Sequence, residues 1–174
     1  GESSEGWRDR SGFSLRQLST ALSYSDEKCD AGMNLSFFTT DYEMPGALLK
    51  EKYDEDPKQA AYFFDEAEMT GFSAAAHITH ETTDMLKLKL TGGFKHKENG
   101  TDMESWFSWT DTDTNSLYVS PSVILTFNQE SFTNILTLGG DFHSDRLRSR
   151  GFNDRARENG TWDNDVTKLS GGIF

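Results

Sequence analysis

The sequence is poor in cysteine, in basic residues and in long hydrophobic runs. Its 174 residues include one cysteine, so Cys29 forms no disulfide within the chain and does not identify a redox compartment. The 17 lysines and arginines stand against 29 aspartates and glutamates, and the net charge is -12. This charge argues against a nucleic-acid partner, which requires a basic surface. No run approaches about 18 apolar residues, which excludes a transmembrane helix.

Recognisable catalytic and metal-binding patterns are absent as well. There is no Ser-His-Asp spacing, phosphate-cradling loop or nucleophile elbow, so we expect neither an enzyme nor a cofactor. His77 and His80 stand three residues apart, and in a strand such residues point to opposite faces and cannot share a metal ion. Asp111–Asn115 resembles the opening of a calcium loop, but Ser116 replaces its glycine and Ser122 its bidentate glutamate. We predict a polar loop tip there and no metal site.

Aromatic residues, in contrast, are plentiful. They make up 13% of the chain, including 13 Phe and 4 Trp, although only 34% of the chain is hydrophobic. The aromatic content excludes a compositionally disordered chain. A polar but aromatic-rich sequence favours a closed β-structure in which the second face of the sheet is wet, and the length corresponds to a single domain.

A period of two in hydrophobicity runs through the chain. Between 116 and 127 the odd-numbered residues are apolar, and the even-numbered ones are mostly small and polar. The apolar set is Leu117, Val119, Pro121, Val123, Leu125 and Phe127. Such alternation predicts strands with one apolar and one polar face. We count about seven strands of roughly ten to fourteen residues, close to the ~9–11 that a tilted strand needs to cross a bilayer.

The parity also predicts which side chains share a face. One outward apolar band should contain Leu86, Leu88, Leu90, Val119, Val123, Leu125, Leu136 and Leu138. Lys87, Lys89, Lys95 and Asp141 should lie on the inner, wet side. Pro121 removes one donor from the hydrogen-bond ladder, which a strand tolerates best at a bulge or an edge.

Short and long connections alternate between the predicted strands. The short ones are 26–31, 81–84 and 128–130, and the long ones are 40–66, 97–115 and 144–164. This is the pattern of outer-membrane barrels, with short periplasmic turns and long outer loops. It requires Trp106–Trp109 to lie within a long loop. The segment 44–65 predicts a structured outer loop, and the only helix expected lies within 47–62.

One predicted loop, 144–164, is rich in arginine. It contributes Arg146, Arg148, Arg150, Arg155 and Arg157 to an otherwise acidic protein. Because arginine binds carboxylates and phosphates bidentately, these residues are candidates for contact with an anionic ligand or with lipopolysaccharide phosphates. The alternative is pairing within the chain, with Asp145, Asp154 and Glu158 or with the acidic stretch at 54–56.

Four stretches together resemble TonB-dependent outer-membrane receptors. Gly6–Ser11 (GWRDRS) and the segment with PGAL at 45–48 and DPKQA at 56–60 are similar to two consecutive receptor segments. Leu117–Leu125 resembles the receptors' L-S-x-x-P-R-L strand, with Ser122 in place of the usual Arg. Leu136–Phe142 (LTLGGDF) resembles their L-T-L-G-x-D-Y strand. The matches span nearly the whole chain in the expected order.

The resemblance implies that residues 1–174 are a single segment of a 22-stranded barrel in the bacterial outer membrane. It also implies uptake of a ferric siderophore, haem, cobalamin or a similar metal chelate. The TonB complex would energise this uptake through an N-terminal plug that we expect to be absent from this chain. The apolar band would then contact outer-membrane lipid. The alternatives are a soluble, self-contained β-barrel that binds a small ligand and an outer-membrane protein without a transport role.

Overall fold

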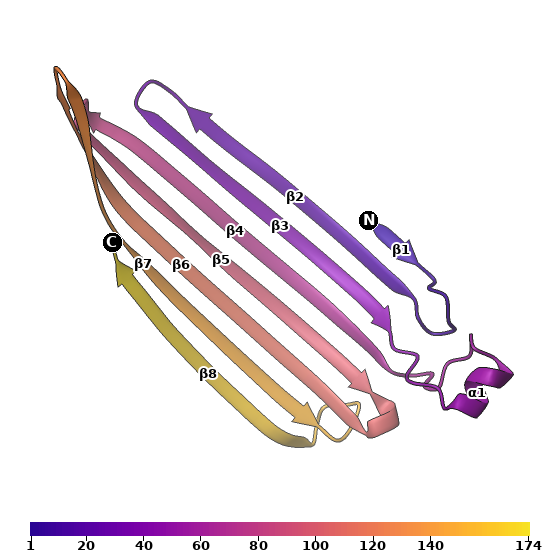
Figure 1. The fold of residues 1–174 in the computed structure, drawn as a ribbon. Coiled ribbons are helices and arrows are strands. Elements are labelled where there is room, and N and C mark those ends of the chain that lie inside the picture. Colours follow the sequence, from indigo (N-terminus) through magenta and orange to yellow (C-terminus); the bar gives the residue numbers. More distant parts are fainter.

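The computed structural model describes residues 1–174 and consists of one antiparallel sheet of eight strands in sequence order. The strands are β1 (Glu2–Ser4), β2 (Phe13–Ser25), β3 (Cys29–Glu43), β4 (Glu66–Thr83), β5 (Leu86–Met103), β6 (Ser108–Gln129), β7 (Phe132–Phe152) and β8 (Gly160–Ile173). The sheet is open, with β1 and β8 at its edges (Figure 1). The prediction of an all-β antiparallel fold with about seven long strands is confirmed, since β1 has only three residues. The predicted length of roughly ten to fourteen residues is too short for β4 to β7, which have 18 to 22 residues.

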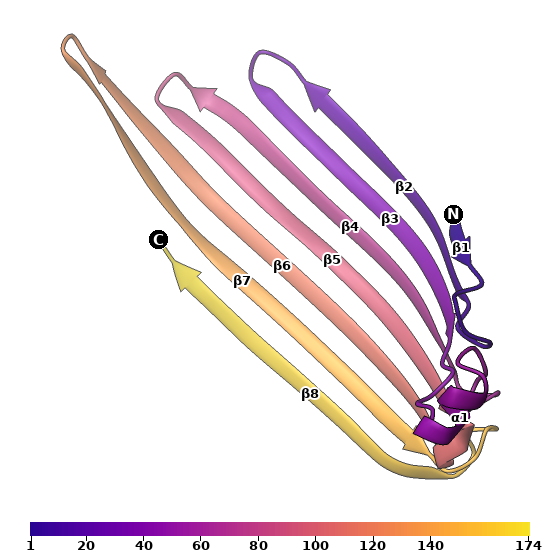
Figure 2. The ribbon, with the colours of Figure 1, turned by 45° about the vertical axis from the view of Figure 1, so that its right-hand side comes forward.

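Helix is confined to two short segments. The helix α1 (Lys50–Glu55) lies in the long connection between β3 and β4, as predicted, and η1 (Glu104–Trp106) is a single 3-10 turn. Neither of them is long or apolar enough to cross a membrane. The long connection and α1 lie at the same end of the sheet as the β5–β6 and β7–β8 connections (Figures 1 and 2). We call this the outer end and the opposite one the short-turn end.

Two of the predicted long loops are wrong in extent. Most of 97–115 and of 144–164 is strand, because β5 reaches Met103, β6 starts at Ser108, β7 reaches Phe152 and β8 starts at Gly160. The alternation of apolar residues ends in this part of the sheet, but backbone pairing continues, and opposite charges face each other across it. The expected polar loop tip at Asp111–Asn115 is therefore part of β6.

The same extension corrects the placement of the tryptophans. Trp106 ends η1, whereas Trp109 belongs to β6, pairs with Asp102 and Phe152, and is buried. Pro121 differs from the prediction, because it lies in the central strand β6, at neither an edge nor a register shift. The β6–β7 register runs to Val119↔Phe142 and resumes at Ser122↔Gly139, so the ladder is interrupted beside the residue that lacks an N–H.

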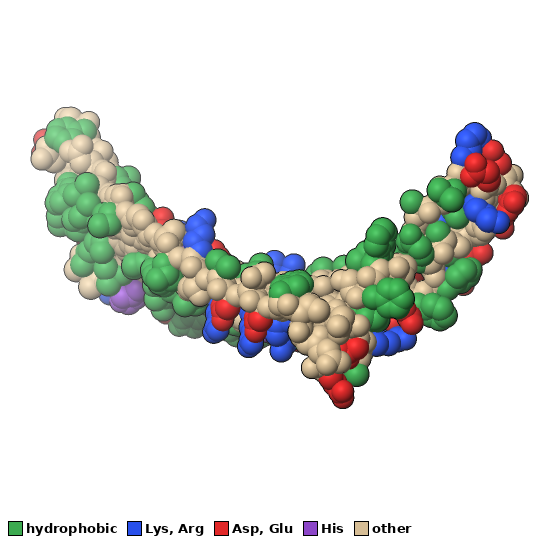
Figure 3. Space-filling view, turned by 90° about the horizontal axis from the view of Figure 1, so that it is seen from below, with side chains coloured by type: hydrophobic (Ala, Val, Ile, Leu, Met, Phe, Trp, Pro, Cys, Tyr) green, Lys and Arg blue, Asp and Glu red, His purple; other side chains and the backbone are tan.

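The sheet is strongly curved (Figure 3), and only 6 of 174 residues are buried. It therefore has no core of its own and presents two exposed faces. The register places all eight predicted leucines and valines of the apolar band on one face, and Lys87, Lys89, Lys95 and Asp141 on the other. This prediction is confirmed. The open sheet also differs from the self-contained soluble barrel considered as an alternative.

Candidate functional site

The convex face has an apolar band next to the short-turn end. On β6 the band extends from Leu117 to Phe127, and Leu90 lies beside Pro121 and Ile78 in one row across the sheet. About ten residues at about 3.3 Å each span roughly 33 Å along a strand. With the strand tilt of about 40° found in outer-membrane barrels, this corresponds to a height of about 25 Å, which is the height of their lipid-facing band.

Aromatic side chains border this band on both sides. Phe37 and Phe72 are direct neighbours at its outer border, where Phe94 and Phe142 continue the border on later strands. At the short-turn border, Tyr24, Phe127 and Phe132 occupy the same face, and all three are exposed. Two aromatic girdles around an apolar band are characteristic of membrane-spanning β-structure.

Beyond the outer girdle, the convex face becomes charged. Three of the five predicted site arginines, Arg146, Arg148 and Arg150, lie in β7 rather than in a loop. Arg146 Nε donates to Asp165 at 3.0 Å, and Arg148 Nη2 donates to Asp163 at 2.7 Å. Basic and acidic side chains project together from the convex side of the sheet in Figure 3.

The other two arginines lie in the β7–β8 connection and reach back over the sheet. Arg157 donates to Asp111 at 2.8 Å and to Asp102 at 2.7 Å. Arg155 lies 3.4 Å from Glu66, and Arg150 lies 3.9 Å from Asp113. All five predicted site residues are thus brought to the outer half of the sheet, and each is paired with carboxylates.

The structure supports pairing within the chain, but with partners other than those predicted. The carboxylates come from β4, β5, β6 and β8 and from η1, whereas Asp145 pairs with Lys168 in the register of the opposite face. Asp154 instead accepts the backbone N–H groups of Glu158 and Asn159, which lowers the pKa of its carboxyl group. A ligand-binding role for the five arginines stays a prediction.

Two of the four stretches that resemble receptor segments, GWRDRS and the segment with PGAL and DPKQA, meet at the outer end. Arg8 donates from Nη1 to the Gly46 carbonyl oxygen at 2.7 Å and from Nη2 to the Gln59 carbonyl oxygen at 3.0 Å. Gly46 has a positive φ of 69°, and a Cβ there would lie 2.2 Å from the Tyr62 ring. These contacts therefore hold the outer loop in its folded form.

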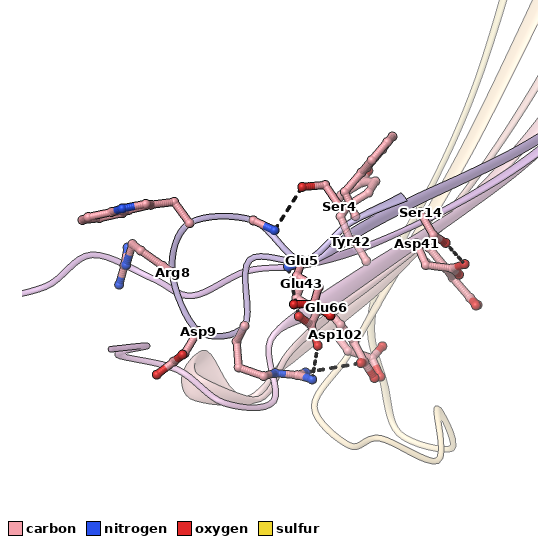
Figure 4. Close-up of a pocket in the computed structure, with 18 of the residues that line it drawn as sticks. Ser4, Glu5, Arg8, Asp9, Ser14, Asp41, Tyr42, Glu43, Glu66 and Asp102 are labelled. Atoms are coloured by element: carbon pink, nitrogen blue, oxygen red, sulfur yellow. Dashed lines mark hydrogen bonds and ion pairs between the residues drawn. The ribbon is translucent and has the colours of Figure 1, made fainter. Parts of the chain in front are cut away.

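Beside this loop lies an open cleft of about 870 Å³. Glu43, Glu66 and Asp102 gather in it, and Arg8 is directed away from them toward the loop (Figure 4). Arg10 pairs with Glu43 and lies 3.7 Å from Glu66. The cleft is predominantly acidic, but no three His, Cys, Asp or Glu side chains in the chain are grouped so that they could hold a metal ion.

The concave face is predominantly polar and contains several glycines. Five of its glycines each lie beneath an aromatic ring from a neighbouring strand or, for Phe174, from the C-terminal residue; the pairs are Gly32–His77, Gly71–Phe38, Gly93–Tyr118, Gly139–Phe174 and Gly151–Trp162. Between them, Ser19, Ser36, Ser73, Lys95 and Ser116 form one row across β2 to β6. His77 belongs to this face and His80 to the convex one, as predicted. Hydroxyl groups, lysines and flat rings therefore line the concave wall.

The comparisons with known proteins agree with this geometry. No protein-family model matches the sequence, and no curated protein matches it. Among solved structures, the ferric citrate transporter FecA in its unliganded form superposes with a TM-score of 0.69 at 16% identity over 96% of this chain. BauA, the ferric preacinetobactin receptor of Acinetobacter baumannii, gives 0.67 at 9% over 95%, and the siderophore receptor PiuA of the same organism gives 0.59 at 11% over 97%.

This chain spans about a quarter to a third of those proteins, covering 26%, 27% and 31% of them. It therefore has the fold of a wall segment from the barrel of a TonB-dependent siderophore receptor, and the recognition made from sequence is confirmed at the level of the fold. These structural neighbours are receptors and transporters rather than enzymes.

Proposed function

We propose that this chain forms part of the barrel wall of an outer-membrane receptor for a ferric siderophore or a similar metal chelate. The observation that carries the proposal is the convex apolar band between two aromatic girdles, opposite a concave face of lysines and hydroxyl groups. A sheet with these two faces suits lipid on one side and an aqueous interior on the other. The fold likeness to three ferric-chelate proteins supports the kind of cargo.

Coupling to the TonB complex through a plug belongs to the same proposal. The support is the similarity of the outer-loop residues to receptor segments and the hydrogen bonds that join them around Arg8. The bacterial outer membrane is the proposed location, since a band about 25 Å high matches the hydrocarbon thickness that barrel strands cross there.

Membrane insertion and iron uptake test separate parts of the proposal. The protein that carries this chain should remain in the membrane fraction after washing with alkaline carbonate, whereas release into the soluble fraction would contradict the convex band as a lipid contact. Cells that express it should accumulate ⁵⁵Fe from at least one chelate, and the accumulation should stop when the TonB complex is removed. Uptake that is independent of TonB would contradict the proposed coupling.

The arginines of the outer half can be tested in the same cells. If they bind an anionic chelate, replacing Arg146, Arg148, Arg150, Arg155 and Arg157 together by Ser should weaken chelate binding, more at low salt than at high salt, because exposed charges are screened over about 8 Å at physiological ionic strength. Unchanged affinity and unchanged salt dependence would leave these residues the role of pairing with their neighbouring carboxylates.

A further inference from the structure

Strand β5 presents a column of lysines on the concave face. Lys89, Lys95 and Lys97 share this face and follow the strand from the short-turn half toward the outer end. Because residues in a strand are about 3.3 Å apart, the column extends over about 26 Å. Along the strand, this is somewhat shorter than the roughly 33 Å of the apolar band on the other face of the sheet.

None of the three lysines has a carboxylate partner. Lys87 on the same face pairs with Glu81 at 2.6 Å, but no Asp or Glu oxygen lies within 4.0 Å of Nζ of Lys89, Lys95 or Lys97. The contrast with the convex face is large, because every arginine of the outer-half cluster there is paired. In a chain with a net charge of -12, the column is a local positive surface that its own carboxylates do not neutralise.

The immediate neighbours of the column are small, and most carry a hydroxyl group. Lys95 lies between Ser73 and Ser116, and Lys89 lies between Thr79 and Ser122. Lys97 lies between Gly71 and Thr114. Hydroxyl groups donate hydrogen bonds to carboxylate or phosphate oxygens, and small neighbours leave the ammonium groups accessible. The nearest concave carboxylates outside Lys87–Glu81 and Asp30–His77 are Asp141 and Asp145 on β7, two strands away.

We propose that this lysine column binds small polyanions, and that in the intact receptor it serves as a series of contacts for a ferric chelate bearing free carboxylates. The inference rests on the proposed function for the identity of the cargo, but the binding of anions to the column does not require transport. Several weak lysine contacts spaced along the barrel wall suit the passage of a chelate, because the chelate can leave one lysine as it binds the next.

Chemical labelling tests the anion site without reference to transport. In the full protein in vesicles, pyridoxal 5′-phosphate and uncharged pyridoxal each form an imine with lysine amines, with loss of water, and borohydride fixes the product for mass spectrometry. The anionic reagent should label Lys95 and Lys97 several-fold more than the neutral one, and citrate should protect them. Lys50, which pairs with Asp54, is the internal reference and should show neither effect.

Binding measurements then test the residues. Replacing Lys95 and Lys97 together by Gln should weaken citrate binding about 4- to 25-fold, from about 2- to 5-fold for each exposed charge pair. The matched control, Lys28→Gln with Lys50→Gln, changes the net charge equally but alters the β2–β3 turn and α1, and it should leave binding unchanged. Lys95→Arg with Lys97→Arg should retain binding, which separates loss of charge from loss of folding.

The outcomes separate the two proposals. Protection of the lysines by citrate together with absent iron uptake would overturn the proposed function and support the anion site. In the converse case, cells take up a carboxylate chelate while both reagents label the lysines equally, or while neither labels them because protein covers the column. Either result would overturn the anion site and support the proposed function. The anion site would also be overturned if the Lys95/Lys97 and Lys28/Lys50 replacements by Gln weakened citrate binding equally, since binding would then follow net charge alone.

Discussion

Arg8 and Gly46 are joined by a hydrogen bond of 2.7 Å between the guanidinium Nη1 and the glycine carbonyl oxygen. The contact connects the β1–β2 connection to the loop that contains α1, across 38 residues of sequence. The same guanidinium also donates to Gln59 at 3.0 Å, so one cation satisfies carbonyl groups at both ends of the loop. These hydrogen bonds therefore hold the outer loop against the β1–β2 connection.

Replacing Arg8 by Ala should therefore loosen the outer loop without unfolding the sheet. Hydrogen bonds that involve a charged group contribute about 1.5–3 kcal/mol each, so local opening of the loop should become easier by about 2–4 kcal/mol. Trypsin should then cleave after Lys50, Lys52 or Lys58 much faster than in the wild type. Arg16→Ala is the control, because Arg16 lies exposed in β2 and forms no ion pair, and it should leave cleavage unchanged.

A second prediction concerns the glycines beneath aromatic rings. A Cβ at Gly93 would lie 2.5 Å from Cε1 of Tyr118 and 2.9 Å from the backbone oxygen of Ala74, which cannot move away as a side chain can. Gly93→Ala should therefore cost about 1–3 kcal/mol in the free energy of unfolding, as overpacking does elsewhere. Gly172→Ala, where no atom lies within 4 Å of the added Cβ, should be neutral. Urea unfolding in lipid vesicles measures both, and equal values would contradict the role of the ring contact.

The sequence predicted the sheet wherever one face is apolar and the other polar. It failed at 97–115 and 144–164, because both faces of the strands are polar there and the period of two disappears from the hydrophobicity. In that part the register is supported by charge pairs such as Arg148–Asp163, whose members lie on different strands and cannot be matched from one strand alone. The concave parity of Lys89 and Lys95 was predictable, but their lack of carboxylate partners depends on the register of β4 and β6.

A third prediction concerns pH and the turn between β7 and β8. The Asp154 carboxylate accepts hydrogen bonds from the backbone N–H groups of Glu158, at 3.1 Å, and Asn159, at 2.7 Å, and these lower its pKa below the ordinary value of 3.8. A carboxyl group whose pKa falls on folding stabilises the folded turn above the ordinary pKa, and this stabilisation is lost as the pH falls through the lowered value.

The amide signals of Glu158 and Asn159 should consequently shift together in a single titration centred below pH 3.8. Asp154→Asn should abolish that titration, since the amide side chain does not ionise. NMR of the protein in detergent micelles gives the measurement, and a midpoint above 3.8 would contradict the hydrogen-bonded turn.

The last prediction compares the two faces of β6 at neighbouring positions. Val123 belongs to the convex apolar band between Leu88 and Leu138, and Ile124 belongs to the concave face between Lys87 and Thr137. Arginine near the middle of a lipid-facing band costs about 2–4 kcal/mol, whereas a position that faces a wet lumen tolerates it. Val123→Arg should therefore lower the free energy of unfolding in vesicles by that amount, and Ile124→Arg should lower it by less than about 1 kcal/mol. Both variants add the same side chain to the same strand, so net charge and strand propensity cancel in the comparison. A larger loss at Ile124 would mean that the concave face is the dry one, and it would contradict the assignment of lipid to the convex band.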